Sequence, residues 1–341
     1  STATTTLSLS GFIGSETVTS TNSSTFNNKN AGTGKTVTVN SITLADGSNG
    51  GLASNYSISA GQTTTAHISP KSLTVSVNTA SNKTYDSNSS AIVTVTLSGF
   101  VGSETLTYTN SSSFSDKNVG TGKTVTVDSI TLADGNNGGL ASNYSITPGQ
   151  TTTANITAKS LIISGIIAAS KTYNGSTSAT LDTSAILYSG LIPGDIFDGS
   201  YTGAFSNANV GTAKTVTITS SYTGADVSNY SITNQTSTNA DISAKSLTAT
   251  ASASNKTYDG GTTASTTLTF TGLVGSETLG QTVGSTFDNK NVGSNKTVTV
   301  NSITLADGTN GGLAANYSIS AGQTTTANIT AKSLTVSNVS A

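Results

Sequence analysis

The 341-residue sequence contains no cysteine, methionine or tryptophan, and all of its basic residues are lysines. Without cysteine the chain can form neither a disulfide framework nor a thiolate metal site. The shortage of oxidisable side chains suits an oxidising exterior. Charged residues make up only 9% of the chain and the formal net charge is −2. The chain therefore has no basic field for nucleic acid and no acidic field for a cation-rich partner.

Long apolar runs are also missing. No stretch of 18 apolar residues occurs, so the sequence predicts no membrane span. The first ten residues, STATTTLSLS, lack the initial methionine, charged segment and apolar core of a secretory signal peptide. We therefore expect the chain to be either processed or cut from a longer protein.

One phrase recurs four times in this polar background. KTVTVNSITLADG begins at Lys35 and returns almost unchanged at Lys123 and Lys296, with a blurred copy at Lys214. A period of about 87 residues is domain-sized, since solenoid repeats span 20–45 residues. We therefore expect tandem modules that each bury a small core of their own. The predicted divisions are 1–70, a repeat without its first strand, then 71–158, 159–244 and 245–331, with 332–341 as an orphan first strand or a donor strand.

The pattern inside each repeat is that of β-strands. Apolar residues alternate from Thr36 to Val39, as one buried strand face requires, and Ile42 and Leu44 continue the alternation in the opposite parity. One extra residue near Asn40 would return the apolar side chains to the same face of the strand, which predicts a β-bulge or tight corner. The DGxNGG segments that follow predict turns, because Gly and Asn tolerate positive φ.

We therefore expect an all-β fold of four small β-sandwich modules with Ig-like character, with β-grasp-like modules as the alternative. Stacked end to end, such modules would form a rod of roughly 150 Å, judged from strand rise. Three aromatic slots recur as expected core positions, and the tyrosine hydroxyls among them need hydrogen-bond partners. The slots are Phe26, Phe114, Phe205 and Phe287; Tyr56, Tyr144, Tyr230 and Tyr317; and Tyr85, Tyr173 and Tyr258.

No catalytic pattern stands out, and we expect a protein that is not an enzyme. The GTGKT segments at Gly32 and Gly120 lack the spacing of a phosphate-binding loop, and their Lys-Thr opens a strand. The lone His67 falls where the other repeats have Asn or Asp, and no partnered nucleophile accompanies it. Repetition of a feature in every copy argues for architecture over a unique active site.

Two chemical alternatives stay open. The turn carboxylates Asp46, Asp134 and Asp307 are weak Ca²⁺ candidates, because calcium prefers six to eight oxygen ligands and here each turn supplies one carboxylate. We otherwise expect no cofactor. Lys and Asn recur in each repeat, which permits a Lys–Asn isopeptide crosslink if the two side chains meet.

The chain ends suggest a third possibility. The segment Lys332, Ser333, Leu334, Thr335 and Val336 matches the first strand that 1–70 lacks. In one interpretation the sequence is an excerpt of a longer array. In the other, this segment fills the gap of an identical chain by strand donation, head to tail, and builds an open filament.

Several segments together resemble a known family. SNKTYDG at Ser254, GLVGSETL at Gly272, NKNVG at Asn289 and NYSI with the following ITAKSLTV at Asn316 are similar to the YDG-type repeats, related to MBG repeats, of large bacterial surface proteins. Such proteins are often filamentous-haemagglutinin-like adhesins. The second and third repeats read YDS at Tyr85 and YNG at Tyr173, so the Asp and Gly cannot both be essential to folding.

The resemblance implies an extracellular, non-enzymatic stalk or adhesive fibre at the bacterial cell surface, with possible glycosylation. Its partners would be adjacent repeats, identical chains, and a host or neighbouring-cell surface. It supplies no ligand site. The alternative function is an array of glycan- or protein-binding modules, in which four copies amplify weak sites.

Overall fold

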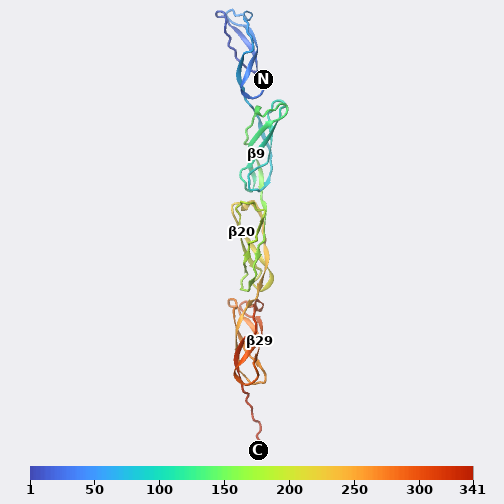
Figure 1. Ribbon diagram of the computed structural model, residues 1–341, viewed down its shortest axis with the longest axis vertical. Coiled ribbons are helices and arrows are strands. Elements are labelled where there is room, and N and C mark those ends of the chain that lie inside the picture. The colour runs from blue at the N-terminus through green and yellow to red at the C-terminus, as the bar shows by residue number, and fades with distance from the viewer. Residues whose placement is uncertain (341) are drawn as a thin grey trace. The chain divides into compact units, whose positions relative to one another are not determined.

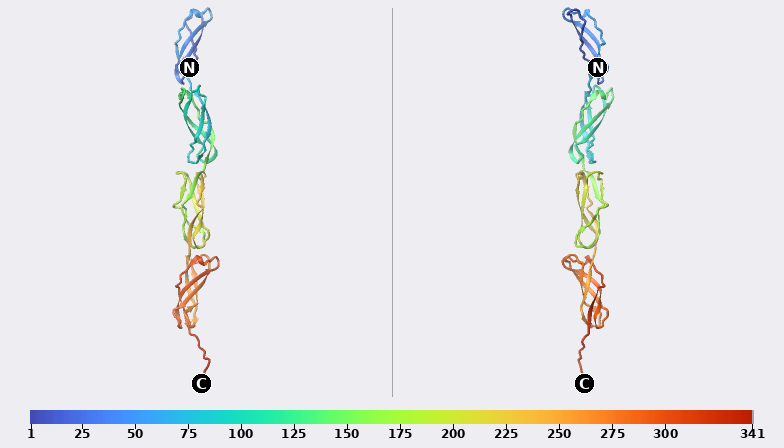
Figure 2. Two further views of the ribbon diagram at one scale, coloured as in Figure 1. Left: turned by 90° about the vertical axis from the view of Figure 1, so that its right-hand side faces the viewer. Right: turned by 60° about the vertical axis from the view of Figure 1, so that its left-hand side comes forward.

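The computed structural model describes residues 1–340, which fall into two compact units, Ser1–Lys159 and Ser160–Ala341. Each unit contains two of the repeats. Apart from four short 3-10 turns, the regular structure of the described residues consists of strands, as all views show (Figures 1 and 2). The all-β prediction is confirmed. No helix in this part of the chain has the length and apolarity needed to cross a membrane.

The first unit holds the strands of repeats 1 and 2. They are β1 (Thr2–Ala3), β2 (Val18–Phe26), β3 (Gly32–Asp46), β4 (Thr63–Ile68), β5 (Lys71–Ser72), β6 (Thr74–Ala80), β7 (Lys83–Thr84), β8 (Val93–Ser98), β9 (Leu106–Phe114), β10 (Gly120–Asp134), β11 (Tyr144–Ser145) and β12 (Thr151–Thr157). The 3-10 turns are η1 (Ala53–Asn55) and η2 (Ala141–Asn143).

The second unit holds repeats 3 and 4. Repeat 3 comprises β13 (Lys159–Ser164), β14 (Ile167–Ala168), β15 (Lys171–Thr172), β16 (Ser178–Ala179), β17 (Leu181–Asp182), β18 (Leu187–Ser189), β19 (Asp198–Phe205), β20 (Gly211–Thr223), η3 (Val227–Asn229), β21 (Tyr230–Thr233) and β22 (Ser237–Ser243). Repeat 4 comprises β23 (Lys245–Ser246), β24 (Thr248–Ala253), β25 (Lys256–Thr257), β26 (Thr263–Ala264), β27 (Thr266–Thr271), β28 (Leu279–Phe287), β29 (Gly293–Asp307), η4 (Ala314–Asn316), β30 (Tyr317–Ser318) and β31 (Thr324–Thr330).

Each repeat is built on one long central strand, which is β3, β10, β20 or β29. In repeat 4 the sheet order is β25-β31-β29-β28-β26, with β29 paired antiparallel to both neighbours. Smaller sheets accompany the main one: β6 with β8 in repeat 2, β18-β13-β21 in repeat 3, and β24 with β27 in repeat 4. The predicted β-sandwich modules are confirmed.

The bulge predicted near Asn40 is confirmed. Ser24 pairs with Val39 and Ser23 with Ser41, so Asn40 is the extra residue that switches the facing of β3. The same shift recurs in β10 and β29. In repeat 3 the pairing of β19 with β20 runs through without a shift.

The DGxNGG segments form the expected turns, and the glycines are needed there. Asn310 has φ 57° and Gly311 φ 86°, the left-handed region that Asn and Gly tolerate. At Gly308 a Cβ atom would stand 2.1 Å from the backbone oxygen of Thr278, so no larger residue fits this turn.

The phenylalanine slot and the NYS tyrosines are core positions in repeats 2 to 4, whereas in the KTY slot Tyr85 and Tyr173 are buried and Tyr258 is half-buried. Phe114, Phe205 and Phe287 are each 3% exposed, whereas Phe26 in repeat 1 is only half-buried. The lysine ammonium groups of the KTY segments lie over these rings, at 5.7 Å from the ring centroid in repeat 2, 5.2 Å in repeat 3 and 5.5 Å in repeat 4.

The expectation that every module closes its own core needs a correction. One cluster, which includes Phe287 and Val298, lies within repeat 4. Another includes Tyr173 and Phe205 of repeat 3 together with Leu247 and Tyr317 of repeat 4. Within the second unit, therefore, the core continues from one repeat into the next. The sequence could not show this, because the contacting residues are far apart in the chain.

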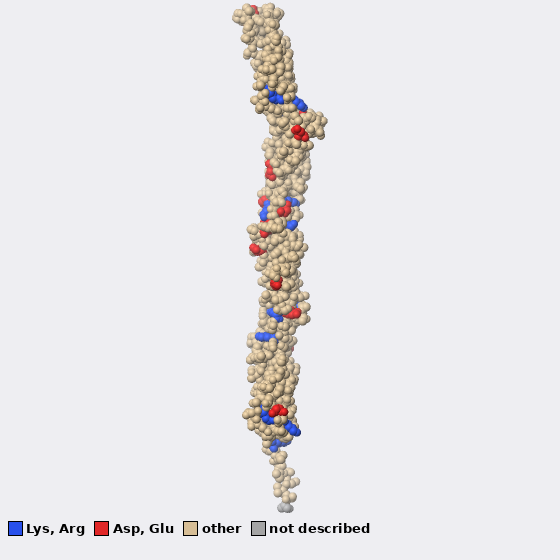
Figure 3. Space-filling view, in the orientation of Figure 1, with Lys and Arg blue, Asp and Glu red and all other residues tan. Residues whose placement is uncertain are grey.

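Charge is sparse over the visible surface, where most atoms belong to uncharged residues and the blue and red groups are small (Figure 3). The polar threonine, serine and asparagine residues that alternate with the core positions cover the strands. Two of the few carboxylates join repeats, since Glu104 contacts Lys29 of repeat 1 and Glu277 contacts Tyr173 of repeat 3.

Candidate functional site: the contacts between successive repeats

Every repeat uses the hydroxyl of its NYS tyrosine to bind a carboxylate. Tyr56 donates to Glu16 at 2.6 Å, Tyr144 to Glu104 at 2.7 Å, Tyr230 to Asp195 at 2.5 Å and Tyr317 to Glu277 at 2.6 Å. The same hydroxyls accept a backbone N–H, from Ile13, Val101, Ile192 and Val274 respectively. Donating and accepting satisfies the phenol completely, and it fixes one oxygen of the carboxylate.

In the second unit the other carboxylate oxygen of repeat 4 binds repeat 3. The hydroxyl of Tyr173, from the KTY segment of repeat 3, donates to Oε1 of Glu277 at 2.7 Å, while Oε2 accepts from Tyr317. The rings of Tyr173 and Tyr317 meet edge to face at 5.4 Å between centroids. One carboxylate thus ties together tyrosines of two repeats.

In the first unit a lysine takes the place of that tyrosine. Nζ of Lys29, in the loop of repeat 1, lies 2.5 Å from Oε1 of Glu104, which is buried in repeat 2. Repeat 3 carries Ala208 at the position of Lys29. Each of these two junctions, one within each unit, therefore supplies one donor to the second oxygen of the glutamate, a hydroxyl in one case and an ammonium group in the other.

A second contact accompanies the carboxylate. The side chain of Asn316, which is 1% exposed, accepts the N–H of Val210 at 2.9 Å and donates to Oδ1 of Asn209 at 3.1 Å. Asn143 makes the same pair of bonds to Ala31 and Asn30, at 2.8 and 3.1 Å. We call the glutamate with its two donors, together with this asparagine, the junction clasp.

The contacts of the clasp shift the pKa values of its glutamate, lysine and tyrosine side chains. The hydrogen bonds from Lys29 and Tyr144 hold the pKa of Glu104 below its usual range, and the bond to Glu104 raises the pKa of Lys29. Burial, followed by the bond to Glu277, raises the pKa of Tyr173 to about 12, and burial also raises that of Tyr317. The clasp therefore favours an ionised glutamate and neutral tyrosines.

The second unit is expected to lose stability in alkali. Because the folded pKa of Tyr173 is about 12 and the ordinary value is about 10, its contribution is complete below pH 10 and is lost as the pH rises toward 12. Unfolding of the full chain, followed segment by segment by hydrogen exchange, measures this loss. Tyr173→Phe should reduce the pH dependence in repeats 3 and 4. An equal dependence with and without the hydroxyl would contradict the role of Tyr173.

The turn carboxylates have a local role. Oδ1 of Asp46 accepts the N–H of Ala53 at 2.7 Å, and Asp134 and Asp307 bind Ala141 and Ala314 in the same way, at 2.7 and 2.8 Å. Each aspartate thus joins the end of the central strand to the following 3-10 turn. No group of three or more His, Asp or Glu side chains positioned to hold a metal ion is found within residues 1–340.

His67 and the recurrent lysines also have structural partners. Nδ1 of His67 accepts the N–H of Gly34, as Asn155, Asp241 and Asn328 do for the equivalent loop N–H groups of their repeats. The lysine that opens each KT segment contacts an Asn or Asp seven residues earlier, as in Lys35 with Asn28 and Lys123 with Asp116. In repeats 1, 3 and 4 the partner is an asparagine, the pairing that the isopeptide alternative requires, whereas Lys123 forms an ion pair with Asp116.

The donor-strand candidates lie in an extended, exposed segment. Leu334 is 92% exposed and Val336 80% exposed, and residues 331–340 belong to no strand. The equivalent leucines Leu73, Leu161 and Leu247 are at most 7% exposed. The leucine of the KSL segment is therefore buried in the core at three positions and exposed at the fourth, Leu334.

Repeat 1 has a matching hollow. It measures about 230 Å³ and is lined by apolar side chains that include Leu9, Phe12 and Leu44. Residues 5–10, which align with β8 of repeat 2, are in no strand, whereas β8 pairs with β6.

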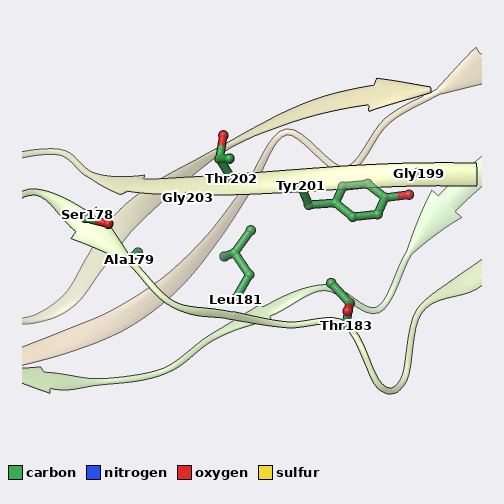
Figure 4. Close-up of a pocket in the computed structure, with 8 residues that line it drawn as sticks. All are labelled: Ser178, Ala179, Leu181, Thr183, Gly199, Tyr201, Thr202 and Gly203. Carbon is green, nitrogen blue, oxygen red and sulfur yellow. The ribbon is translucent and has the colours of Figure 1, made fainter. Parts of the chain in front are cut away.

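A further hollow, of about 360 Å³, occurs in repeat 3 beside β19. Gly199 and Gly203 flank Tyr201 on this strand, and Figure 4 shows Leu181 pointing toward the strand from the facing segment. The hydroxyl of Tyr201 lies 3.1 Å from that of Tyr188. Other repeats have larger side chains than glycine at these positions, so the hollow is a local feature of repeat 3.

A profile described as YDG domain matches the chain four times, over residues 1–66, 69–154, 157–238 and 243–327. No curated protein matches the sequence. The clasp residues were not singled out from the sequence, although a signal existed. Glu16, Glu104 and Glu277 each precede an NYS tyrosine by 40 residues.

Proposed function

Because the chain belongs to the YDG domain family and consists of four tandem copies, we propose that it is a non-enzymatic structural and adhesive repeat region of an extracellular bacterial surface protein. In this proposal the repeats act as a stalk that carries a binding region away from the cell. The family membership and the repeat organisation are established by the matches. Adhesion, the extracellular location and the bacterial source belong to the proposal.

The junction clasp is the observation that supports this function best. A flexible string of independent domains needs no buried polar contacts between its members. Here a glutamate and an asparagine of one repeat bind the loop or the KTY tyrosine of the preceding repeat, at one junction in each unit. Contacts of this kind limit bending at the junction and transmit force, which is what a stalk requires.

Surface labelling tests the location and the structural role together. An antibody raised against the full chain should label intact producing cells, and electron micrographs of the labelled material should show the antigen in projecting rods or fibres. Labelling that requires cell lysis would contradict the proposal.

A filament is the more specific form of the same function. We propose that Lys332–Val336 of one chain fills the incomplete repeat 1 of another. The observations in support are the exposure of Leu334, the apolar hollow of repeat 1 and the unpaired residues 5–10. By analogy with repeat 2, where Val75 pairs with Leu97, Val336 would pair with Leu9.

Removal of residues 331–341 is expected to abolish multimers of the full chain that persist on dilution. The physical reason is that the apolar hollow and the unpaired backbone groups lose their complement. Sedimentation at several concentrations measures the effect, and Leu334→Asp in the full-length chain should act in the same direction. A chain that is monomeric at all concentrations would reject strand donation.

The glycan-binding alternative stays a prediction. The hollow beside Tyr201 in repeat 3 combines an aromatic ring with hydroxyl side chains, the mixture of groups that carbohydrates contact. A glycan array would favour this alternative if the full chain bound and Tyr201→Ala removed the binding. Absence of binding by the unaltered chain would favour the stalk.

A further inference from the structure

Repeats 1 and 4 carry the two halves of a junction clasp. Repeat 1 presents Glu16, Asn55 and Tyr56, which correspond to Glu277, Asn316 and Tyr317 of repeat 4. We call these three residues the carboxylate face. At the other end, Tyr258, Lys290, Asn291 and Val292 of repeat 4 correspond to the residues of repeats 1 and 3 that bind a carboxylate face, and we call them the loop face.

The carboxylate face of repeat 1 is preformed. Tyr56 donates to Oε2 of Glu16 and accepts the N–H of Ile13, so the glutamate is held as Glu277 is held in repeat 4. Oε1 of Glu16 has no hydrogen-bond partner within residues 1–340. Asn55 is exposed, whereas the equivalent Asn316 is buried against repeat 3.

The loop face of repeat 4 also presents groups that can bind a partner. Within residues 1–340 the Tyr258 hydroxyl and the N–H of Val292 have no hydrogen-bond partner, and Val292 is 54% exposed. A hollow of about 470 Å³ lies between Tyr258, Asn291 and Val292 on one side and the tail residues Ala331, Lys332 and Leu334 on the other. In repeat 3 the equivalent hydroxyl of Tyr173 and N–H of Val210 are both bonded to the next repeat.

The charges of the two faces are complementary. At the observed junctions the glutamate binds either a KTY tyrosine, in repeat 3, or a loop lysine, in repeat 1. Repeat 4 has both donors, Tyr258 and Lys290. Glu16 supplies the carboxylate that such donors bind. Desolvated, charge-assisted hydrogen bonds of this type give an interface its specificity.

We propose that the loop face of repeat 4 is a docking site for the carboxylate face of a second copy of this chain. The hydroxyl of Tyr258 and the ammonium of Lys290 bind Glu16 of the second copy. Asn55 of that copy accepts the N–H of Val292 and donates to Asn291. The contact is heterologous and leaves both outer faces open, so it continues from chain to chain.

This inference rests on the proposed filament but goes further than strand donation. The donated strand fills the hollow of repeat 1, whereas the clasp sets the orientation and the choice of partner. A strand can enter a related gap on backbone hydrogen bonds alone. The clasp additionally requires a carboxylate and an asparagine 39 residues apart in the partner, as Glu16 and Asn55 are.

Thiol crosslinking between two full-length variants tests the docking, because the natural chain contains no cysteine. One chain carries Asn55→Cys and the other Asn291→Cys, and the mixture is treated with a short bismaleimide. Asn209→Cys with Asn316→Cys in a single chain is the positive control, since those side chains touch at 3.1 Å. Asn55→Cys mixed with Thr269→Cys, an exposed position on β27, gives the background.

We expect the 55–291 product, identified by peptide mass spectrometry, in roughly tenfold excess over the 55–269 product, the ratio expected from one or two charge-assisted hydrogen bonds. Adding Tyr258→Phe to the Asn291→Cys chain should reduce the excess several-fold. Equal yields of the two products would overturn the docking. If tail-dependent multimers formed but the yield of the 55–291 product stayed at background, strand donation would stand and the clasp between chains would be rejected. If the yield of the 55–291 product exceeded background but no tail-dependent multimers formed, the clasp between chains would stand and strand donation would be rejected.

Discussion

Replacing Phe287 by alanine is expected to destabilise repeat 4 by about 3–5 kcal/mol, the usual range for a buried phenylalanine. The ring is 3% exposed, packs in the cluster that includes Val298 and Ile329, and lies beneath the ammonium group of Lys256. Truncation leaves a cavity and removes the cation–π contact together. Hydrogen exchange of the full chain, resolved by peptide, measures the loss in repeat 4 separately from the other repeats.

Phe26→Ala is the matched control for this substitution. Phe26 occupies the same slot in repeat 1 but is half-buried. Its removal should cost about 1–2 kcal/mol, in line with the smaller area that it buries. A loss in repeat 1 as large as that in repeat 4 would mean that the deeper burial of Phe287 and its contact with Lys256 add nothing to stability.

Glu277→Ala is expected to loosen repeats 3 and 4 together, by about 2–4 kcal/mol, because two tyrosine hydroxyls lose their acceptor. Tyr173 and Tyr317 belong to different repeats and both bind this carboxylate. The free energy of opening should therefore fall on both sides of the junction. Hydrogen exchange at the peptides that contain the two tyrosines provides the measurement.

Glu16→Ala removes the same side chain from the same motif but breaks only the bond to Tyr56. We expect a loss of about 1 kcal/mol that is confined to repeat 1. If Glu277→Ala affected only repeat 4, as Glu16→Ala affects only repeat 1, the carboxylate would not couple the repeats. Measurements at low protein concentration keep any contact between chains out of the comparison.

Much of the fold follows from the sequence because strand patterning is local. The change of parity between Val39 and Ile42 predicted the bulge at Asn40, and the DGxNGG segments predicted turns with positive φ. The recurrent Phe slot and the NYS tyrosines were correctly assigned to the core in repeats 2 to 4, but Tyr258 of the KTY slot is only half-buried. Repetition helped, since a feature that returns at each period is easier to recognise than a single occurrence.

The clasp was not predicted, because its partners are remote in sequence. Tyr173 and Glu277 are 104 residues apart, and nothing local in either segment points to the other. The hydroxyls were expected to need partners, but the partners were not identified. A constant 40-residue interval between each glutamate and its NYS tyrosine was present in three repeats, and the shorter interval of 35 in repeat 3 reflects its shortened turn.

The continuity of the core in the second unit also escaped prediction. Alternating apolar residues show which side of a strand is buried, but not whether the covering atoms belong to the same repeat. Leu247 opens repeat 4 by sequence period, and yet it shares a cluster with Phe205 of repeat 3. The junction therefore has both an apolar and a polar component.

The protection of three backbone N–H groups tests the central claim that successive repeats are clasped. Ala31, Val210 and Val292 occupy the same loop position, but only the first two donate to an asparagine of the next repeat. In a dilute solution of the unaltered chain, hydrogen exchange followed by NMR should find Ala31 and Val210 protected and Val292 exchanging at nearly the rate of an open loop. Exchange at Ala31 and Val210 as fast as at Val292 would contradict the clasp.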